Sequence, residues 1–274
     1  MVADPVAHSY SPLIHNTAFY DQGLNARYLP FRVPADDLHI FLQNARNLGV
    51  SGISVTIPHK ERTLEYCTQA ESSANGIGAV NTVIFQGKDN LGYNTDYRAA
   101  MDCIEEVLTL KKDVDKPMQG MSVLILGAGG VSRALAWGLR QRGAEITITS
   151  RTFERSNLLA SEIGCRVVEW EDRHSQKVNL LVNGTPIGMH PDVDSTPYNP
   201  SAMNQFMVVF DTVYNPESTL LIKHAKKHGC RIITGIDMFV RQAAYQYKLF
   251  TGRDAPIALM RDTIKKATNP VQLN

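Results

Sequence analysis

The sequence predicts an α/β protein of two domains, the second built on a doubly wound parallel sheet. Three observations predict this. In the second half, short apolar runs alternate with segments of helical period. A glycine cluster, Gly127 to Gly130, directly follows the first of these runs. The charged stretch 111–120, which contains a proline and ends in glycine, separates this half from a differently patterned first half.

Composition narrows the class of protein. Hydrophobic residues make up 43% of the 274 residues, enough for a substantial core. The net charge of +1 gives no support for a nucleic-acid or membrane-surface partner, which requires a concentrated positive field. No leader-like start and no apolar run of about 20 residues is present. The widely spaced cysteines predict neither a metal site nor a redox dithiol and favour the cytoplasm: Cys67, Cys103, Cys165 and Cys230.

The first half shows two strands and one helix. Residues 52–57 alternate and are β-branched, and Pro58 ends that strand because proline cannot donate to a ladder. A second strand is expected over 79–85, followed by a turn at 87–90. Apolar residues at helical spacing predict a helix over 95–110. These residues are Tyr97, Met101, Ile104 and Leu108.

The second half is a series of buried strands and helices. The apolar run at 122–126 is expected to be a strand buried on both faces. Helical patterns follow the glycine cluster, recur over 220–228 and end with a long segment, 237–250, before Gly252. The remaining strands are expected at 145–149, 179–182, 207–210 and 232–234.

The cluster Gly127-Ala128-Gly129-Gly130 predicts a dinucleotide site. Glycines let the backbone approach a pyrophosphate, whose charge is then held at the helix N-terminus. The third glycine of the usual spacing is replaced by Ser132, so this is a variant fingerprint. The alternative is an ordinary tight turn between strand and helix.

Basic and hydroxyl side chains follow the next strand. An NAD-binding chain usually carries a carboxylate there for the ribose hydroxyls. This chain has Ser150, Arg151 and Thr152, with Arg155 one helical turn further on. Guanidinium and hydroxyl groups suit a 2′-phosphate, which a carboxylate would repel. NADP is therefore the favoured cofactor, and a solvated helix start is the alternative.

Polar residues of the first half suggest a substrate site, although each has a simpler interpretation. Ser9 and Ser11 are alternate residues that can present two hydroxyls to a carboxylate, or can cap the helix that follows. Lys60 follows a strand end, where a lysine is usually a solvated charge. Asp96 belongs to the run Asn94-Thr95-Asp96, which could equally be a helix cap.

Taken together, these motifs resemble the shikimate dehydrogenase family over almost the whole chain. The C-terminal motif, given last in the list below, is most similar to the one in the dehydrogenase half of fused dehydroquinase–shikimate dehydrogenases. The motifs, in chain order, are His8-Ser9-Tyr10-Ser11-Pro12, Val55-Thr56-Ile57-Pro58-His59-Lys60, Gly78-Ala79-Val80-Asn81-Thr82, Gly92-Tyr93-Asn94-Thr95-Asp96, Gly127-Ala128-Gly129-Gly130, Asn183-Gly184-Thr185-Pro186-Ile187-Gly188-Met189 and Gly235-Ile236-Asp237-Met238 leading to Gln242.

The resemblance implies reversible NADPH-dependent reduction of 3-dehydroshikimate to shikimate, a step toward chorismate and the aromatic amino acids. It implies that Lys60 and Asp96 are catalytic. The substrate-binding residues it implies are Ser9, Ser11, Thr56, Asn81, Tyr214 and Gln242. The NADP-binding residues are Gly127, Ala128, Gly129, Gly130, Ser150, Arg151, Thr152, Arg155, Thr185, Gly235 and Met238.

The family pattern also implies how the domains divide. Residues 1–103, completed by 237–274, form an α/β substrate domain, and 104–236 form a Rossmann-like NADP domain, with the active site expected in the cleft between them. Ser150 replaces the family's usual asparagine. Only Met1 to Ala3 remain of the family's first strand, which suggests a truncated start or a domain taken from a longer, dehydroquinase-containing polypeptide.

Two alternative functions remain on the same scaffold. A quinate dehydrogenase, often using NAD, would share the fold, but residues 11, 56 and 150–152 favour shikimate and NADP. A catalytically inactive regulator that senses NADP or a metabolite should have lost the lysine or the aspartate. Lys60 and Asp96 are both present.

Overall fold

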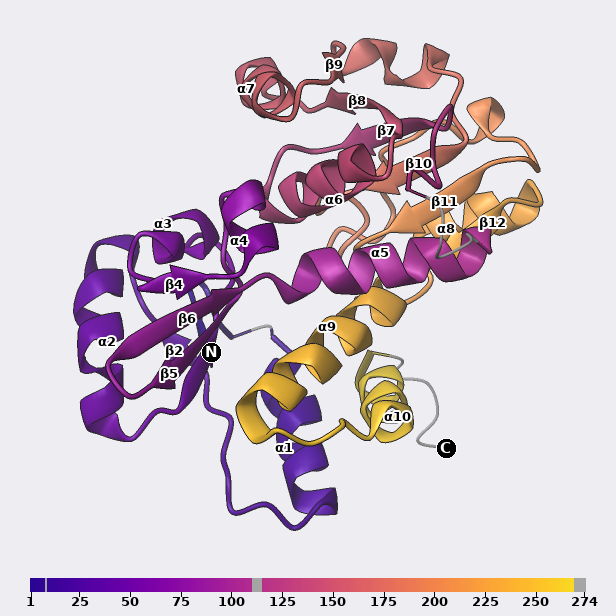
Figure 1. Cartoon of the computed structure of the whole chain (residues 1–274). Helices are drawn as coiled ribbons and strands as arrows, with labels where there is room; N and C mark the ends of the chain where they lie inside the picture. The colour runs from indigo at the N-terminus through magenta and orange to yellow at the C-terminus, as the bar shows by residue number, and fades with distance from the viewer. Residues whose placement is uncertain (8, 110–114, 269–274) are drawn as a thin grey trace, which may run out of the picture. The chain divides into compact units, whose positions relative to one another are not determined.

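A computed structural model describes residues 1–7, 9–109 and 115–268 (Figure 1). The chain forms two compact units. The first unit is Met1–Ala99 with Val240–Ala267, and the second is centred on Ala100–Phe239. The divisions fall inside two helices, α5 (Thr95–Leu108) and α9 (Gly235–Thr251). Each unit has its own sheet and its own core.

The second unit contains a six-stranded parallel sheet in the order β12-β11-β10-β7-β8-β9. Counted from β7, this is the 3-2-1-4-5-6 order of a Rossmann fold, with its switch point between β7 and β10. The central strands are apolar because helices cover both faces of such a sheet. The strands are β7 Ser122–Leu126, β8 Glu145–Thr149, β9 Arg166–Val167, β10 Leu180–Asn183, β11 Val208–Asp211 and β12 Arg231–Ile233.

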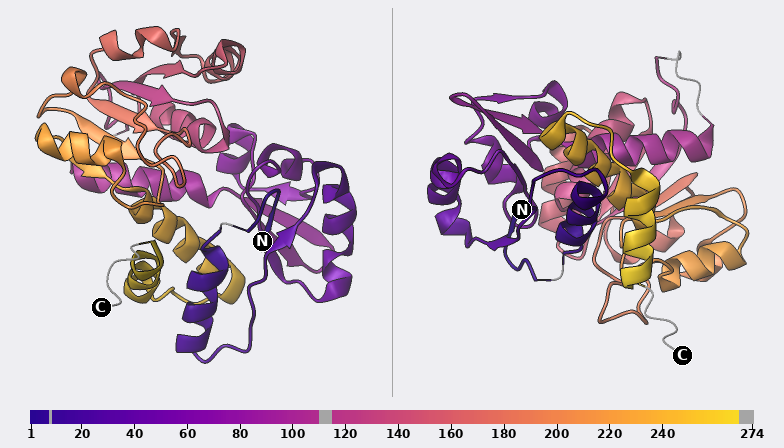
Figure 2. Two further views of the ribbon diagram at one scale, coloured as in Figure 1. Left: turned by 180° about the vertical axis from the view of Figure 1, so that it is seen from behind. Right: turned by 90° about the horizontal axis from the view of Figure 1, so that it is seen from below.

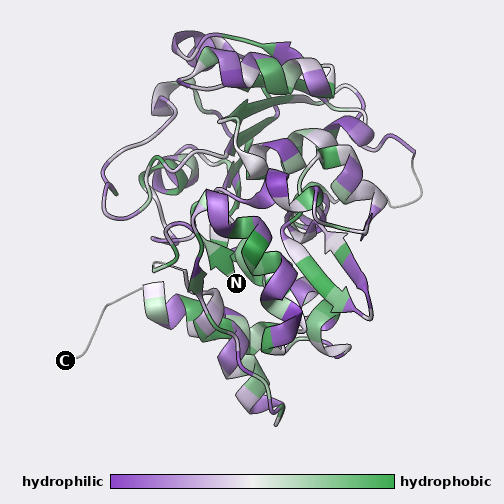
Figure 3. Ribbon diagram, turned by 90° about the vertical axis from the view of Figure 1, so that its left-hand side faces the viewer, coloured by the Kyte–Doolittle hydropathy of each residue, from purple (hydrophilic) through white to green (hydrophobic). Residues whose placement is uncertain are grey.

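Helices connect these strands as right-handed crossovers require. α6 (Gly130–Gln141) joins β7 to β8, and α7 (Phe153–Ile163) packs on β8 and β9. α8 (Leu220–Lys227) packs on β11 and β12. Figure 3 shows why the helices pack on this sheet. The strands are mainly hydrophobic, and the helices have both hydrophobic and hydrophilic residues around their circumference, so one side of each helix can cover the sheet.

The first unit is built on a mixed four-stranded sheet in the order β3-β5-β6-β4. A separate parallel pair, β1 with β2, joins residues 2–3 to residues 31–32, and Val2 also bridges to Val55. The strands are β1 Val2–Ala3, β2 Phe31–Arg32, β3 Gly52–Ser54, β4 Gln69–Ala70, β5 Thr82–Gln86 and β6 Asp89–Tyr93. The remaining helices of this unit are α1 Ser11–Asp21, α2 Leu38–Asn44, α3 Lys60–Leu64, α4 Ser72–Ile77 and α10 Ile257–Thr268.

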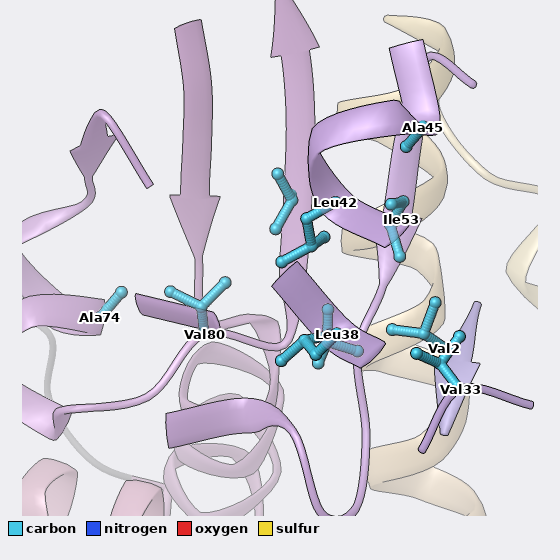
Figure 4. Packing of buried hydrophobic residues seen from close by; sticks show 10 residues of the cluster. Val2, Val33, Leu38, Leu42, Ala45, Ile53, Ala74 and Val80 are labelled. Carbon is cyan, nitrogen blue, oxygen red and sulfur yellow. The ribbon is translucent and has the colours of Figure 1, made fainter. Parts of the chain in front are cut away.

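One hydrophobic cluster lies between α2 and the strands (Figure 4). Leu38 and Leu42, one helical turn apart, turn the same face of α2 toward Ile53 and Val80. Val2 is fully buried in this cluster, so the two-residue strand β1 contributes to the core. Burying each such side chain stabilises the fold by roughly 1.5–3 kcal/mol.

On the other side of the first unit, α1 and α9 lie side by side in both figures that show them (Figures 1 and 2). Phe19 of α1 packs on Tyr247 of α9, with ring centroids 5.4 Å apart. The Tyr247 hydroxyl donates to Gln22 Oε1 at 2.9 Å. This contact encloses His15, whose ring stacks on Tyr28 at 4.4 Å. His15 is fully buried.

The expected strands and helices of the second unit are confirmed to within about two residues. In the first unit the strands are shorter than expected: β3 ends at Ser54, and β5 begins at Thr82. The turn expected at 87–90 is wrong in its second half, because β6 begins at Asp89 and pairs antiparallel with β5. Leu110, His8 and residues 111–114 lie outside the described residues. No described helix is long and apolar enough to span a bilayer.

Candidate active site

Lys60 and Asp96 form an ion pair in the first unit. Lys60 Nζ donates to Asp96 Oδ2 at 2.5 Å, although the two residues are 36 positions apart. Their side chains are only 11% and 10% exposed. Such a shielded lysine is not the solvated surface charge that a lone lysine usually is. The pair offers a cation and a proton donor beside a carboxylate acceptor.

Backbone hydrogen bonds explain why these two residues meet. Lys60 begins α3, and its carbonyl accepts from Val80 N at 2.8 Å. Asn81 N donates to Tyr93 O at 3.0 Å, within the antiparallel pairing of β5 and β6. Asp96 lies in the first turn of α5, directly after β6. The start of α3 and the start of α5 are therefore both tied to the segment that leads into β5.

Asn81 holds the start of α5 in place. Its side-chain oxygen accepts from Thr95 N at 2.8 Å and from Thr82 Oγ1 at 2.9 Å, and its amide donates to Thr95 Oγ1 at 2.9 Å. Asn94 Oδ1 accepts from Tyr97 N at 3.0 Å and so caps the helix. The capping role weighed for this run therefore belongs to Asn94, which leaves Asp96 free to pair with Lys60.

Gln246 is a residue of this site that sequence reasoning missed. From α9, its amide nitrogen donates to Thr82 Oγ1 at 3.0 Å, and its oxygen accepts from Ser54 Oγ at 2.9 Å. It thus bridges the end of β3 and the start of β5. Its one available signal was its place four residues after Gln242, on the same face of a predicted helix.

The first of the predicted substrate-binding hydroxyl groups lie at the start of α1. Ser9 Oγ accepts from Ser11 N at 3.3 Å, a local turn ahead of the helix. Ser11 is buried, while Thr56 is half-buried in the loop before Lys60. Gln242 is buried on α9, one turn before Gln246. These residues belong to the same unit as Lys60 and Asp96.

Tyr214, the remaining predicted substrate residue, falls in the second unit. It follows β11, and its ring stacks on Phe239 with centroids 4.4 Å apart. The side chain is half-buried.

The glycine turn has the form that a dinucleotide requires. Gly127 has φ +103°, which favours glycine, and a Cβ there would meet Gly184 O at 2.9 Å. A Cβ on Gly129 would meet open space. Gly129 is the N-cap of α6, and no side chain caps that end. Ala128 and Gly130 flank it. The uncapped N–H groups and the clear approach fit a pyrophosphate.

The predicted 2′-phosphate residues follow β8. Arg151, Thr152 and Arg155 are exposed at the start of α7. Neither arginine makes an ion pair with any residue in the described part of the chain. Ser150 Oγ donates to Thr152 O at 2.7 Å, which orders this loop. Two unpaired guanidinium groups fit an anionic ligand.

The other predicted cofactor residues have clear structural partners. Thr185 Oγ1 donates to Asn183 Oδ1 at 2.6 Å, in the loop after β10. A Cβ on Gly235 would overlap the backbone of Val213 and Tyr214, so this position requires glycine for packing alone. Met238 is buried in the first turn of α9. Across the residues that the structure describes, no group of three or more His, Cys, Asp or Glu side chains could hold a metal ion.

Three family models match this chain. Residues 1–83 match the shikimate dehydrogenase substrate binding domain, and residues 109–184 match shikimate / quinate 5-dehydrogenase. Residues 235–265 match the shikimate 5′-dehydrogenase C-terminal domain. The three matches follow the order of the motifs along the sequence.

Individual relatives are similar to this sequence over nearly its full length. Shikimate dehydrogenase (NADP+) of Methanothermobacter thermautotrophicus is 38% identical, over 98% of this chain and 96% of the relative. The bifunctional 3-dehydroquinate dehydratase/shikimate dehydrogenase of Arabidopsis thaliana is also 38% identical, over 97% of this chain but 46% of its own length. Shikimate 5-dehydrogenase of Thermus thermophilus, solved with NADP(H) and shikimate, has a TM-score of 0.84 at 32% identity, over 97% of each chain. The chain therefore belongs to the shikimate dehydrogenase family.

Proposed function

We propose that this chain is an NADP-dependent shikimate dehydrogenase, which interconverts 3-dehydroshikimate and shikimate. The observation that carries the proposal is the shielded Lys60–Asp96 pair at 2.5 Å. The glycine turn before α6 and the unpaired Arg151 and Arg155 support the cofactor. Relatives named for this activity with NADP match along almost all of the sequence.

The reaction needs one hydride and one proton. When bound, NADPH supplies the hydride to the carbonyl carbon of 3-dehydroshikimate. Negative charge then develops on the carbonyl oxygen, which Lys60 stabilises as a cation and neutralises by giving up a proton. In the reverse direction Lys60 takes the proton from the substrate hydroxyl. Asp96 keeps the ammonium oriented through its 2.5 Å hydrogen bond and is able to accept from a neighbouring hydroxyl.

Other residues hold the substrate and the cofactor. In this proposal Ser9, Ser11 and Tyr214 bind the substrate carboxylate, and Thr56, Asn81 and Gln242 bind the ring hydroxyls. Neutral hydroxyls and amides suit these groups because they donate without the desolvation cost of a buried charge. Gly127–Gly130 and Thr185 would hold the cofactor, Ser150–Arg155 would bind its 2′-phosphate, and Gly235 and Met238 would contact its nicotinamide. Residues 1–103 with 237–274 then form the substrate domain, and residues 104–236 form the NADP domain.

Quinate dehydrogenase is the second candidate, because one of the matching family models covers both shikimate and quinate enzymes. Quinate carries an extra hydroxyl on the tetrahedral ring carbon that bears the carboxylate. Ser11, which is proposed to bind at this end of the ring, is buried. A confined site that fits a flat ring penalises the bulkier one by clash and by imperfect pairing.

One assay tests the proposal. Purified protein is mixed with shikimate or quinate and with NADP or NAD, and the absorbance of the reduced nicotinamide is followed. We expect shikimate with NADP to give the highest kcat/KM, at least about 10²-fold above quinate. Equal turnover of quinate would transfer the assignment to quinate dehydrogenase. No turnover in any of the four mixtures would favour a regulator on the same scaffold.

Two finer proposals concern the setting of the enzyme. We propose a cytoplasmic location, since the four cysteines are free thiols, the state that a reducing compartment maintains. Cell fractionation with an antibody tests it. Fusion to a dehydroquinase, as in the plant relative, is the other proposal, and the mass of the protein purified from its native cells tests it directly.

A further inference from the structure

Two polar side chains close the carboxyl ends of adjacent central strands in the second unit. Asn183 ends β10 and Asp211 ends β11, and the two residues are partners in the strand register. Both are fully buried. The carboxyl ends of parallel strands form the edge at which doubly wound sheets bind ligands. Contacts between these two residues can therefore affect the position of the loops that are proposed to bind the nucleotide.

The carboxylate of Asp211 is an acceptor for three donors. Asn183 Nδ2 donates to Oδ1 at 3.0 Å, Val213 N donates to Oδ1 at 3.0 Å, and Thr219 Oγ1 donates to Oδ2 at 2.6 Å. No cation pairs with it among the described residues. Burial raises the pKa of Asp211 to about 6, against the lowering effect of these three hydrogen bonds. At neutral pH the group is mainly an anion that only accepts.

This anion determines which way the Asn183 amide points. A carboxylate cannot donate, so the amide nitrogen must face Asp211 and the amide oxygen must face away. The oxygen accepts from Thr185 N at 3.0 Å and from Thr185 Oγ1 at 2.6 Å. A reversed amide would place two acceptors against each other at Asp211 and two donors against each other at Thr185.

The loop held by Asn183 lies directly against the glycine turn. Gly184 N donates to Leu126 O at 2.8 Å, at the end of β7. A Cβ on Gly127 would meet Gly184 O at 2.9 Å. Two segments proposed to bind the cofactor, the glycine turn and the Thr185 loop, therefore meet here. The position of the second segment depends on the orientation of one buried amide.

We propose that Asp211 is a positioning residue for the dinucleotide cofactor, acting through Asn183 on the 184–187 loop. It does not touch the cofactor. This inference rests on the proposed function, namely that the second unit binds NADP(H). Because the loop meets the pyrophosphate turn rather than the adenosine end at Arg151, the effect of Asp211 is the same for NADPH and NADH.

The experiment measures cofactor affinity separately from turnover. Asp211→Leu keeps a similar side-chain volume but has no acceptor oxygen, so the Asn183 amide loses its partner on β11. We expect NADPH to bind about 10-fold more weakly in a fluorescence titration, as losing a hydrogen bond to a charged group allows, and NADH to weaken by the same factor. At saturating NADPH, kcat and the KM for shikimate should stay within about 3-fold of wild type, since Lys60 and Asp96 are in the other unit.

Thr219→Val is the matched control. It removes another donor from the same carboxylate and also the cap of α8, where Thr219 Oγ1 accepts from Ile222 N at 3.2 Å, but it leaves the Asn183–Asp211 bond intact. It should lower Tm while NADPH affinity stays within about 2-fold. Equal loss of NADPH affinity in both variants, or wild-type affinity in Asp211→Leu, overturns the proposal. Wild-type protein that binds neither NADPH nor NADH would instead overturn the proposed function.

Discussion

At the scale of single residues, Lys60 is the group whose loss should matter most for turnover. It is 11% exposed and bonded to Asp96, whereas Lys248 of the same unit is 62% exposed and paired with Asp254. We expect Lys60→Ala to lower kcat by roughly 10²- to 10⁴-fold, the usual contribution of an acid–base group. NADPH affinity should barely change.

Lys248→Ala is the control for this prediction, because it also removes an ion-paired lysine from the first unit. It should retain wild-type kcat, since exposed pairs contribute about 0–1 kcal/mol and Lys248 lies at the end of α9. Steady-state kinetics with saturating NADPH makes the comparison. A Lys60→Ala enzyme with near-normal kcat would exclude the catalytic role.

Arg151 should set the preference between the two nicotinamide cofactors. Its guanidinium is exposed and has no acidic partner in the described chain, so it is available to a 2′-phosphate. A charge-assisted bond contributes about 1.5–3 kcal/mol, or one to two decades in affinity. Arg151→Ala should raise KM for NADP by that factor and leave KM for NAD nearly unchanged. Arg166→Ala, an exposed arginine on β9, is the control. Equal losses for both cofactors would indicate a structural role instead.

How far the sequence predicts this site depends on whether a residue belongs to a local pattern. Lys60 and Asp96 could be singled out because each lies in a short motif, and the structure brings them together. Gln246 and Asp211 could not. Gln246 contacts the carbonyl of Asn81, 165 positions away, and Asp211 simply ends an apolar strand. The role of such a buried polar residue depends on partners that are distant in the sequence, and the spacing of neighbouring residues does not indicate those partners.

At the scale of secondary-structure elements, strand length decides what can be predicted. The central strands of the second unit are four or five residues long and are buried except at the first residue of β7 and of β8, so the apolar runs indicate them clearly. β1, β2, β4 and β9 each contain two residues, too few to carry a period. β6 is polar and follows a glycine turn, so its residues resemble a loop until their pairing with β5 is known.

The variant glycine fingerprint has an explanation at this same scale. The third glycine usually allows close packing between the helix and the sheet. Here Ser132 takes that position, and a Cβ on the facing residue Gly184 would overlap Ser132 Oγ. The small residue needed at this contact is thus supplied by the loop after β10 instead of by α6.

Because Ser132 and Gly184 are in contact, a substitution at one position should compensate for the stability lost by a substitution at the other. Gly184→Ala should destabilise the protein by about 1–3 kcal/mol, the usual effect of overpacking. Ser132→Ala alone should cost little stability, because the buried Ser132 hydroxyl has no hydrogen-bond partner among the described residues. The double variant should recover most of the lost stability, since only the oxygen overlaps and Ser132 Cβ lies at 3.4 Å. Urea denaturation of the four proteins measures this, and purely additive effects would contradict it.

At the scale of the whole molecule, two buried groups give the two units opposite responses to acid. In the first unit, burial and then the N-terminal ammonium lower the pKa of His15 from 6.5 to about 3. The Gln246 amide lies beside its ring, but neither ring nitrogen makes a hydrogen bond of ordinary geometry within the described chain. In the second unit, burial raises the pKa of Asp211 from 3.8 to about 6. The two shifts act on stability over overlapping ranges of pH.

The direction of each effect follows from which state binds the proton. Below pH 6.5 the unfolded chain protonates His15 but the folded first unit does not, so the first unit loses stability as the pH falls. Below pH 6 the folded second unit protonates Asp211 before the unfolded chain does, so the second unit gains stability in that range. Each effect reaches about 1.4 kcal/mol per pH unit. His174 and His224 of the second unit oppose its gain, but both are partly exposed, which reduces their effect.

Acidification should therefore weaken the first unit relative to the second. Both tryptophans, Trp137 and Trp170, lie in the second unit, so tryptophan fluorescence reports its unfolding alone, while far-UV circular dichroism reports both units. Between pH 7.5 and 5.0 we expect the free energy of unfolding of the first unit to fall relative to that of the second. In urea titrations the circular dichroism transition should move to lower denaturant, away from the fluorescence transition. His15→Phe, which keeps a ring against Tyr28, should reduce this movement without abolishing it, because burial also lowers the pKa of the Met1 amino group to about 5 and lowers the pKa of His59 in the same unit. Asp211→Asn should change only the fluorescence transition. If the two transitions shift together in the wild type, or if His15→Phe leaves their separation unchanged, buried His15 is not the source of acid sensitivity.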